Sequence, residues 1–329
     1  MLEINSLVER IKTVSTSNFD ALALDIYRFQ YLNNEVYEQW STYLGKTPDN
    51  VDQLSKIPFL PIEFFKSHKV QSGNWIEQVV FESSGTSGNQ TSRHLVFDEQ
   101  FYLDNCIRAF VSNYGSISDY TILALLPSYL ERDNSGLISM VNHFIELTNS
   151  SDSGFYLNEL DELYSNLLQL RDSGRKVILW GVTFALIDFA EKYKVDFPEL
   201  IVMETGGMKG RREELVRSEV HEKLRKAFGV NQVHSEYGMT ELFSQAYSKG
   251  AGLFYPSNTM KVIGREVNDP LAYPSNNKTV AFNIIDLANI YTCSFIESKD
   301  IGTIMEEESF EVKGRLDNSD IRGCNLLVV

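Results

Sequence analysis

Hydrophobic residues recur at helical spacing over the first part of the chain. Between Ile4 and about Leu44, apolar residues such as Leu7 and Ile11 fall three or four positions apart, with polar residues between them. This is the period of an amphipathic helix. The pattern predicts two or three helices, which would form a helical N-terminal segment over residues 1–54.

Two prolines interrupt the next segment, "KIPFLPIEFFKSHKV". Pro58 and Pro61 lack an amide hydrogen and fix the backbone φ angle, so they exclude one continuous helix. We expect an extended, tightly turned path that leads into the main body of the protein.

Short apolar runs then alternate with longer helical patterns. The runs are rich in β-branched residues, which is typical of strands, and lie at 78–85, 120–128, 176–182, 199–207 and 231–238. Helical patterns at 155–174 and 210–229 both end in glycine, a frequent helix terminator. The alternation indicates an α/β body with a mostly parallel sheet over residues 55–252.

The pattern changes after about Leu253. Strand-like runs such as "TMKVIGREV" and "KTVAFNIIDL" are broken by Asn, Pro and Gly, and little helix is indicated. This predicts a β-rich subdomain over residues 253–312, followed by a hinge and C-terminal tail over 313–329. No segment has the roughly 18 to 20 uninterrupted apolar residues of a membrane span.

Composition and charge narrow the functional classes. The chain is 43% hydrophobic and 23% charged, as expected for a globular protein. Its 30 basic and 45 acidic residues give a net charge of −15, which repels nucleic acids and anionic lipid surfaces. We therefore expect a small-molecule ligand, with no nucleic acid and no membrane span.

The cysteines indicate neither a disulfide framework nor a zinc site. Cys106, Cys293 and Cys324 are odd in number, far apart and outside any metal-binding spacing. The N-terminus also lacks the apolar stretch of a signal peptide. We expect a cytoplasmic protein.

The first candidate for chemistry is a Ser- and Gly-rich segment after the first strand pattern. It contains Ser83, Ser84, Gly85, Thr86, Ser87 and Gly88. Small residues allow backbone N–H groups to converge on an anion, so the segment is suited to holding phosphates. A flexible Ser/Gly turn explains the same composition. Because no Lys follows Gly88, it is not the P-loop motif, and Asn89 excludes the nucleophile-elbow motif.

Three further features are weak when taken singly. The segment 236–241, "EYGMTE", offers an aromatic ring, a hydroxyl and a carboxylate that suit a purine, a phosphate and Mg²⁺. Asp300 in "SKDIGTI" and Arg315 in "KGRLDNSDIRG" suit a ribose. Each has an ordinary structural explanation as a capped turn or a surface turn.

The joint order of these features resembles the adenylate-forming superfamily of acyl-CoA synthetases. "IPFLPIEFFKSH", "SSGTSGNQTSRH", "ETGGMKGRREEL" and the ending "RGCNLLVV" are similar, more narrowly, to the LuxE-type acyl-protein synthetases, with phenylacetate-CoA ligases as neighbours. The resemblance covers roughly residues 55–329. It implies an adenylate-forming N-terminal-domain-like α/β body, without the superfamily's full C-terminal domain.

The resemblance implies a set of ligand-binding roles, with ATP and Mg²⁺ as cofactors. Ser83 to Gly88 hold the ATP phosphates, and Gly206, Gly207, Tyr237 and Gly238 lie at the adenine. Thr240 contacts the α-phosphate, Glu241 holds Mg²⁺, and Asp300 and Arg315 address the ribose. The implied reaction converts a carboxylic acid, expected to be a fatty acid, to acyl-AMP.

The resemblance also implies an acyl acceptor. A cysteine near the C-terminus accepts the acyl group as a thioester in this family, and Cys324 matches it, with Arg322 nearby to favour the thiolate. Cys106 and Cys293 are expected to be buried.

Full-length members of the superfamily continue into a C-terminal domain that supplies a catalytic lysine, and the resemblance to the shorter acyl-protein synthetases implies that this domain is absent here. Four residues are candidates for that positive charge: Arg93, His94, Lys209 and Arg211.

Two alternatives stay open. One is an acyl-CoA or phenylacetate-type ligase, whose acceptor is coenzyme A and not a protein thiol. The other is a nucleotide-binding scaffold without turnover.

Overall fold

The computed structural model groups the chain into two compact units. It describes residues 3–83, 91–127, 134–206, 216–269, 271–272, 274, 279–305 and 308–316. Unit 1 comprises Met1–Ala109, Gly238–Ala246 and Tyr255–Leu316, and the described part of unit 2 comprises Phe110–Tyr237 and Tyr247–Phe254. The four-segment division drawn from the sequence stays a prediction.

Unit 1 begins with three helices, which confirms the helical periodicity of the sequence. They are α1 (Ile4–Lys12), α2 (Phe19–Asn33) and α3 (Glu35–Tyr43). The side chain of Asn34 accepts a hydrogen bond from the Tyr37 amide at 3.0 Å. This N-cap satisfies an amide that the helix itself leaves unpaired, and it starts α3 immediately after α2.

The proline-containing segment is mostly extended, as predicted. It contains a short 3₁₀ turn (Leu54–Lys56) and β1 (Leu60–Pro61), which pairs in parallel with β13 (Phe295–Ile304). A one-turn helix, α4 (Phe64–Ser67), follows directly. Pro61 lies at the end of this two-residue strand, where its missing amide hydrogen costs the ladder little.

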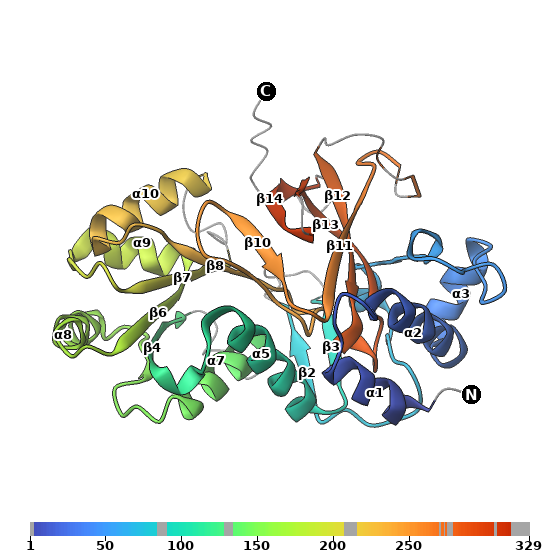
Figure 1. Cartoon of the computed structure of the whole chain (residues 1–329), viewed down its shortest axis with the longest axis horizontal. Helices are drawn as coiled ribbons and strands as arrows, with labels where there is room; N and C mark the ends of the chain where they lie inside the picture. The colour runs from blue at the N-terminus through green and yellow to red at the C-terminus, as the bar shows by residue number, and fades with distance from the viewer. Residues whose placement is uncertain are drawn as a thin grey trace. The chain divides into compact units, whose positions relative to one another are not determined.

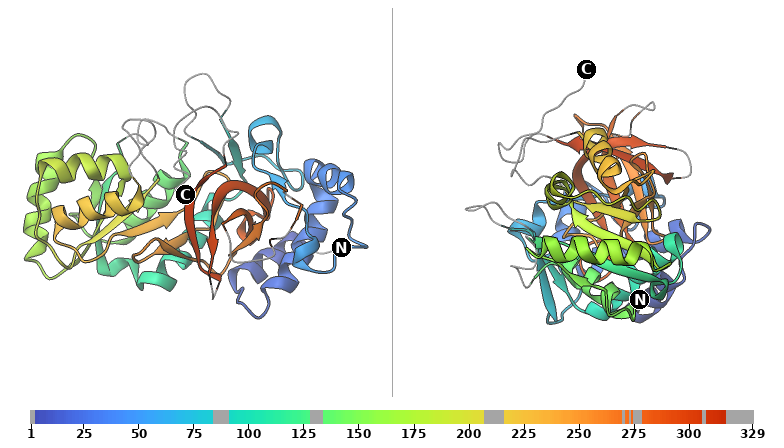
Figure 2. Two further views of the ribbon diagram at one scale, coloured as in Figure 1. Left: turned by 90° about the horizontal axis from the view of Figure 1, so that it is seen from above. Right: turned by 90° about the vertical axis from the view of Figure 1, so that its left-hand side faces the viewer.

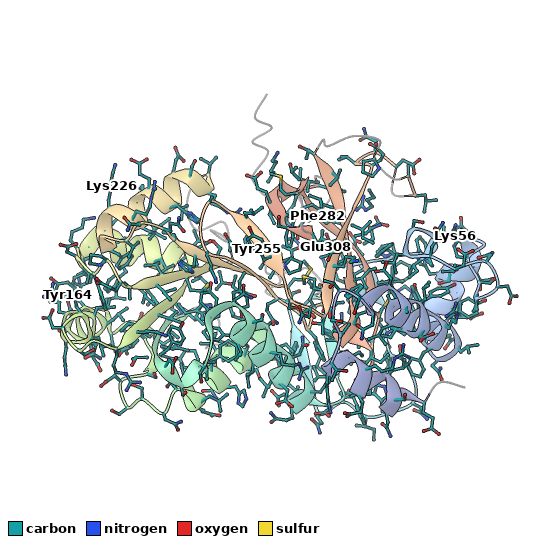
Figure 3. The ribbon with its side chains drawn as sticks, in the orientation of Figure 1. Lys56, Tyr164, Lys226, Tyr255, Phe282 and Glu308 are labelled. Atoms are coloured by element: carbon teal, nitrogen blue, oxygen red, sulfur yellow. The ribbon has the colours of Figure 1, made fainter. Side chains whose placement is uncertain are left out.

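The β-rich part of unit 1 is an antiparallel sheet, which confirms the change of pattern after Leu253. Its strands run in the order β11 (Met260–Arg265), β12 (Val280–Asp286), β13 and β14 (Phe310–Arg315). Every residue of β12 is buried, and Phe282 on this strand, labelled in Figure 3, meets the Phe310 ring at 5.5 Å.

The N-terminal helices pack on this sheet, so distant parts of the sequence lie side by side in unit 1 (Figure 2). The Tyr37 ring stacks on the Phe295 ring at 5.7 Å. The Gln30 amide donates to the carbonyls of Asn289 and Ile290, which belong to the connection between β12 and β13. This connection begins with a 3₁₀ turn (Leu287–Asn289).

The strand predicted at 78–85 does not belong to the parallel sheet. β2 (Val79–Glu82) pairs antiparallel with β3 (Arg93–Val96) in a separate two-stranded sheet within unit 1. A parallel crossover needs about a dozen residues or more, usually including a helix. The connection over residues 83–92 is shorter than this, and therefore the chain returns antiparallel.

The parallel sheet predicted from the alternating pattern is confirmed in unit 2. Its strands are β4 (Tyr120–Leu125), β5 (Gly154–Phe155), β6 (Lys176–Val182), β7 (Ile201–Thr205) and β8 (His234–Tyr237), in the order β8-β7-β6-β4-β5. All these pairings are parallel. β4 and most of β6 are buried, as strands covered on both faces require.

Helices lie on both faces of the unit 2 sheet. They are α7 (Gly136–Leu147), α8 (Leu160–Arg171), α9 (Thr183–Lys192) and α10 (Arg217–Phe228), with a 3₁₀ turn (Ile117–Asp119) before β4. Figure 1 shows α9 and α10 on one face and α7 on the other. Gly229, at φ +71°, ends α10 in the left-handed conformation that glycine favours.

Three elements contain a boundary between the units. They are α5 (Glu99–Tyr114), β9 (Ala246–Ser248) and β10 (Leu253–Pro256). Over the described residues, every helix is too short or too polar to cross a lipid bilayer.

Candidate functional site

The Ser- and Gly-rich segment is anchored at its two ends by Ser83 and Ser92. The Ser83 amide donates to the Ser92 carbonyl at 3.1 Å, and the Ser92 amide donates to the Ser83 hydroxyl at 2.9 Å. These bonds extend the β2–β3 pairing by one step. Five residues of the predicted phosphate cradle lie outside the described residues: Ser84, Gly85, Thr86, Ser87 and Gly88.

The predicted magnesium ligand, Glu241, lies against this anchor within unit 1. Its side chain is buried, with 6% exposed, and accepts a hydrogen bond from the Ser92 hydroxyl. Burial raises the pKa of Glu241, whereas the Ser92 bond and the positive charges of Arg315 and Lys66 act in the opposite direction. The structure therefore joins two predicted motifs, because Ser83 contacts Ser92 and Ser92 contacts Glu241.

The backbone after Glu241 is held by buried polar side chains. The side-chain amide of Asn289 donates to the backbone carbonyl of Glu241 at 2.7 Å. The Asp286 carboxylate accepts from the amides of Phe243, at 2.7 Å, and Ser244, at 2.9 Å. Burial raises the pKa of Asp286 to about 6, although these hydrogen bonds favour its anion. These contacts fix the position of the turn that carries Thr240 and Glu241.

The predicted ribose pair is formed as an ion pair. Asp300 and Arg315 lie opposite each other on β13 and β14, and Arg315 Nε donates to Asp300 Oδ1 at 3.0 Å. Asp300 is buried, while about two thirds of the Arg315 side chain (66%) is exposed. The positive charge of Arg315 also lowers the pKa of Glu241. Glu241, Asp300 and Arg315 therefore form one charged cluster in unit 1. Their role toward a ribose stays a prediction.

The predicted adenine-binding residues of unit 2 lie at the carboxyl ends of neighbouring parallel strands. Gly206 follows β7 at φ +75°, and Tyr237 ends β8, with its ring 5.9 Å from the Phe254 ring. Ligands of open α/β sheets bind at this edge. Gly207 lies outside the described residues. Gly238, the first residue of the next unit 1 segment, is exposed.

The same edge of unit 2 holds two buried carboxyl groups that the sequence analysis did not single out as a pair. The Thr205 hydroxyl donates to Glu236 at 2.5 Å, and the Thr183 hydroxyl donates to Glu204. Burial raises the pKa of Glu236 to about 7, and the negative charge of Glu204 adds to that shift. Burial also raises the pKa of Glu204, which Arg217 partly offsets.

Two of the four candidates for the positive charge of the superfamily's catalytic lysine, His94 and Arg93, lie in different surroundings. His94 is fully buried, and both ring nitrogens have partners at hydrogen-bond distance, so it is not a free cation. Arg93 is exposed and lies 3.6 Å from the Glu82 carboxylate. Lys209 and Arg211 lie outside the described residues. Lys66, which acts on Glu241, is a candidate that the sequence analysis missed, although it lies within the recognised segment "IEFFKSH".

The cysteines divide into two buried residues and one outside the description. Cys106 and Cys293 have no exposed surface, which confirms their predicted burial. Burial raises the pKa of the Cys293 thiol to about 12, so this thiol stays protonated at neutral pH. The predicted acceptor Cys324 and its neighbour Arg322 lie outside the described residues.

A metal site made by protein ligands alone is not found in the described part of the chain. Those residues contain no group of three or more His, Cys, Asp or Glu side chains arranged to hold an ion. Mg²⁺ at nucleotide sites, however, is usually held by one or two carboxylates together with substrate phosphates. A single carboxylate at Glu241 fits that pattern.

No family model and no curated protein matches this chain. Comparison with solved structures does give matches. An open conformation of 2-hydroxyisobutyryl-CoA ligase, in complex with 2-HIB-AMP and CoA, matches with a TM-score of 0.66 at 12% identity. The match covers 91% of this chain and 70% of that one.

Two further structures agree. The same ligase in its postadenylation state with 2-HIB-AMP has a TM-score of 0.66 at 12% identity, over 94% of this chain and 70% of the other. ATP-bound MatB from Rhodopseudomonas palustris has a TM-score of 0.53 at 14% identity, over 74% of this chain and 49% of the other. At these identities the likeness shows a shared α/β fold.

Proposed function

We propose that the protein activates a carboxylic acid with ATP. A carboxylate oxygen of the acid attacks the α-phosphorus of ATP, the bond to the β-phosphate oxygen breaks, and acyl-AMP and pyrophosphate form. The carboxylate needs this step because its negative charge repels a thiol nucleophile. The reaction depends on positioning and on charge stabilisation more than on a protein base.

One observation carries the proposal: the chain of contacts from Ser83 through Ser92 to Glu241. It joins the anchor of the proposed phosphate-binding segment to the proposed metal ligand within unit 1. The fold shared with a CoA ligase bound to 2-HIB-AMP supports it. ATP is the proposed nucleotide, since a solved structure of similar fold, MatB, holds ATP.

The charges around Glu241 support its proposed role as the ligand of a magnesium ion that accompanies the phosphates. Burial alone disfavours an ionised Glu241, but Arg315 and Lys66 favour the anion, and a bound Mg²⁺ would favour it further. In this proposal Glu241 holds Mg²⁺, Thr240 contacts the α-phosphate, and Asp300 and Arg315 hold the ribose. Lys66 supplies positive charge near the phosphates.

The remaining nucleotide contacts are proposed from the resemblance. Ser83, Ser84, Gly85, Thr86, Ser87 and Gly88 cradle the phosphates, and Gly206, Gly207, Tyr237 and Gly238 border the adenine. Backbone amides of such a segment offer hydrogen-bond donors without side-chain obstruction.

The second step transfers the acyl group to a thiol. We propose that Cys324 attacks the acyl carbonyl as a thiolate, so that the bond to AMP breaks and a thioester forms, as in a LuxE-type acyl-protein synthetase. A fatty acid is the proposed substrate, and a further acceptor protein is the proposed destination. The cytoplasm is the proposed compartment, because thiols stay reduced there.

A CoA ligase is the second candidate. The observation in its favour is that the 2-hydroxyisobutyryl-CoA ligase structure of similar fold contains CoA. Under this function the thiol is that of coenzyme A, and Cys324 has no part in the reaction.

ATP–pyrophosphate exchange across short, long and aromatic acids tests the first step. We expect exchange with at least one class of acid, and no exchange with any acid would favour a non-catalytic scaffold. Cys324→Ser then separates the two acceptors. It should keep exchange and lose self-acylation, detected by intact mass, under the main proposal, whereas unchanged acyl-CoA formation would support the CoA ligase.

A further inference from the structure

His94 connects the anchor of the Ser- and Gly-rich segment to the Thr240–Glu241 turn. Its ring is fully buried in unit 1, with Nδ1 2.8 Å from the Thr240 carbonyl oxygen and Nε2 2.9 Å from Thr292 Oγ1. The imidazole lies 4.6 Å from the Phe243 ring and 5.6 Å from the Phe65 ring. Contacts on its edges and its faces therefore allow the ring little freedom to move.

The two partners determine the tautomer of His94. A carbonyl oxygen only accepts hydrogen bonds, so Nδ1 must carry the hydrogen that is donated to Thr240. In a neutral ring Nε2 is then an acceptor, and the Thr292 hydroxyl donates to it. Burial lowers the pKa of His94 to about 4, which agrees with a neutral ring. His94 thus gives one directed hydrogen bond to the turn.

Thr292 is itself held in place. Its backbone carbonyl oxygen accepts hydrogen bonds from the side-chain amide of Asn34 at 2.8 Å and from the Ser72 hydroxyl at 2.5 Å. Asn34 is the N-cap of α3, so this support comes from the N-terminal helices. The far side of His94 therefore rests on a fixed part of unit 1.

The two residues that reach the turn lie two positions apart at the start of β3. Side chains at positions i and i+2 of an extended strand point to the same side. Ser92 donates to the Glu241 side chain, and His94 donates to the Thr240 carbonyl. We propose that His94 is a positioning residue, which holds the Thr240–Glu241 turn in register with the anchor of the phosphate-binding segment. This inference rests on the proposed adenylation activity.

Two substitutions separate the directed hydrogen bond from simple packing. In His94→Asn the side-chain amide nitrogen falls close to the position of Nδ1 and keeps a donor for Thr240. In His94→Gln the amide group falls close to the position of Nε2, and the donor to Thr240 is lost. Both variants remove the ring and its packing, and they differ in length by one methylene and in which partner the amide reaches, Thr240 for Asn and Thr292 for Gln.

We expect His94→Gln to lower kcat of ATP–pyrophosphate exchange by roughly 10- to 100-fold, with a smaller change in KM for ATP, since small misplacements of reacting groups have effects of that size. His94→Asn should keep kcat within about threefold to fivefold of the wild type, because it keeps the hydrogen bond on which the tenfold effect depends. A purely structural role would lower both variants equally.

Hydrogen exchange of the peptide over residues 238–246 gives a readout that does not need catalysis. Exchange should be faster in His94→Gln than in wild type and His94→Asn. Thr292→Val, which removes only the hydroxyl on the far side, should give a smaller increase and covers the case in which the His94 variants do not fold.

The results distinguish the positioning role from the proposed function. Equal kcat or equal hydrogen exchange in the Asn and Gln variants would overturn the positioning role. Hydrogen exchange in Thr292→Val that is unchanged from wild type would overturn it as well. A wild-type protein without pyrophosphate exchange would overturn the proposed function, while the hydrogen-exchange comparison would still decide whether His94 holds the turn.

Discussion

Glu236 in unit 2 and Glu241 in unit 1 are only five positions apart in the sequence, and both are buried. Their surroundings differ. Glu241 accepts a hydrogen bond from Ser92, and the positive charges of Arg315 and Lys66 lower its pKa. Glu236 accepts a hydrogen bond from Thr205, and the negative charge of Glu204 raises its pKa. Burial raises the pKa of both carboxyl groups, but positive charges counteract this at Glu241 and a negative charge adds to it at Glu236. Glu241 is suited to binding a cation as an anion, and Glu236 is suited to keeping its proton.

The largest effect is expected from removing the charge at Glu241. Glu241→Gln keeps an acceptor for the Ser92 hydroxyl but loses the negative charge that the proposed metal needs. We expect kcat/KM for pyrophosphate exchange to fall by about 10²- to 10³-fold, the size of effect seen when one electrostatic group is lost from a site.

Glu222→Gln is the matched control for this substitution, because Glu222 is exposed on α10 and pairs only with Lys226 in the described contacts. The Glu222→Gln variant should keep the wild-type rate of ATP–pyrophosphate exchange. An active Glu241→Gln enzyme with unchanged magnesium dependence would show that the carboxylate of Glu241 is not the ligand.

A smaller effect, on stability, is expected from Glu236. Burial raises its pKa from the ordinary value of 4.5 to about 7 in the folded protein. The folded state therefore holds the proton more tightly than the unfolded chain does. The stabilisation from this group is fully present below pH 4.5 and is lost as pH rises through about 7. The loss is on the order of 3 to 4 kcal/mol, because the pKa rises from 4.5 to about 7 and each pKa unit corresponds to about 1.4 kcal/mol.

Glu236→Gln tests this sign, since its amide oxygen can still accept from Thr205. The free energy of unfolding, measured with urea at pH 5 and pH 8, should favour the variant more at pH 8 than at pH 5 relative to wild type. The same difference at both pH values would mean that Glu236 is ionised in the folded protein over the whole range.

The smallest effect is expected from Lys66. Its positive charge acts on Glu241 from α4, and we expect Lys66→Gln to lower kcat of pyrophosphate exchange about tenfold, which corresponds to about 1.4 kcal/mol. Lys69→Gln is the control, because Lys69 is exposed three residues further on. Equal activity of the two variants would remove Lys66 from the list of charges that assist the reaction.

Local patterns predicted much of the fold. The strand expected at 176–182 has the same bounds as β6, and the glycine-terminated helical pattern ending at Gly229 contains α10. The sheet assignment of residues 78–85 was wrong, because a strand pattern does not reveal its partner. The pairing of β2 with β3 depends on the short connection between them.

The site was only partly predictable for a related reason. Motifs indicated Glu241, Asp300 and Arg315, but the proposed roles of His94 and Lys66 depend on interactions with residues far away in the sequence. His94 meets Thr240 146 positions later and Thr292 198 positions later. No local pattern contains such information.

Calorimetric titration with ATP in the presence of Mg²⁺ shows whether the Glu241 cluster belongs to a nucleotide site. We expect saturable binding to wild type below about 1 mM, the upper end of common KM values, and clearly weaker binding to Glu241→Gln. Absence of binding to the wild type, or equal affinity of the two proteins, would contradict it.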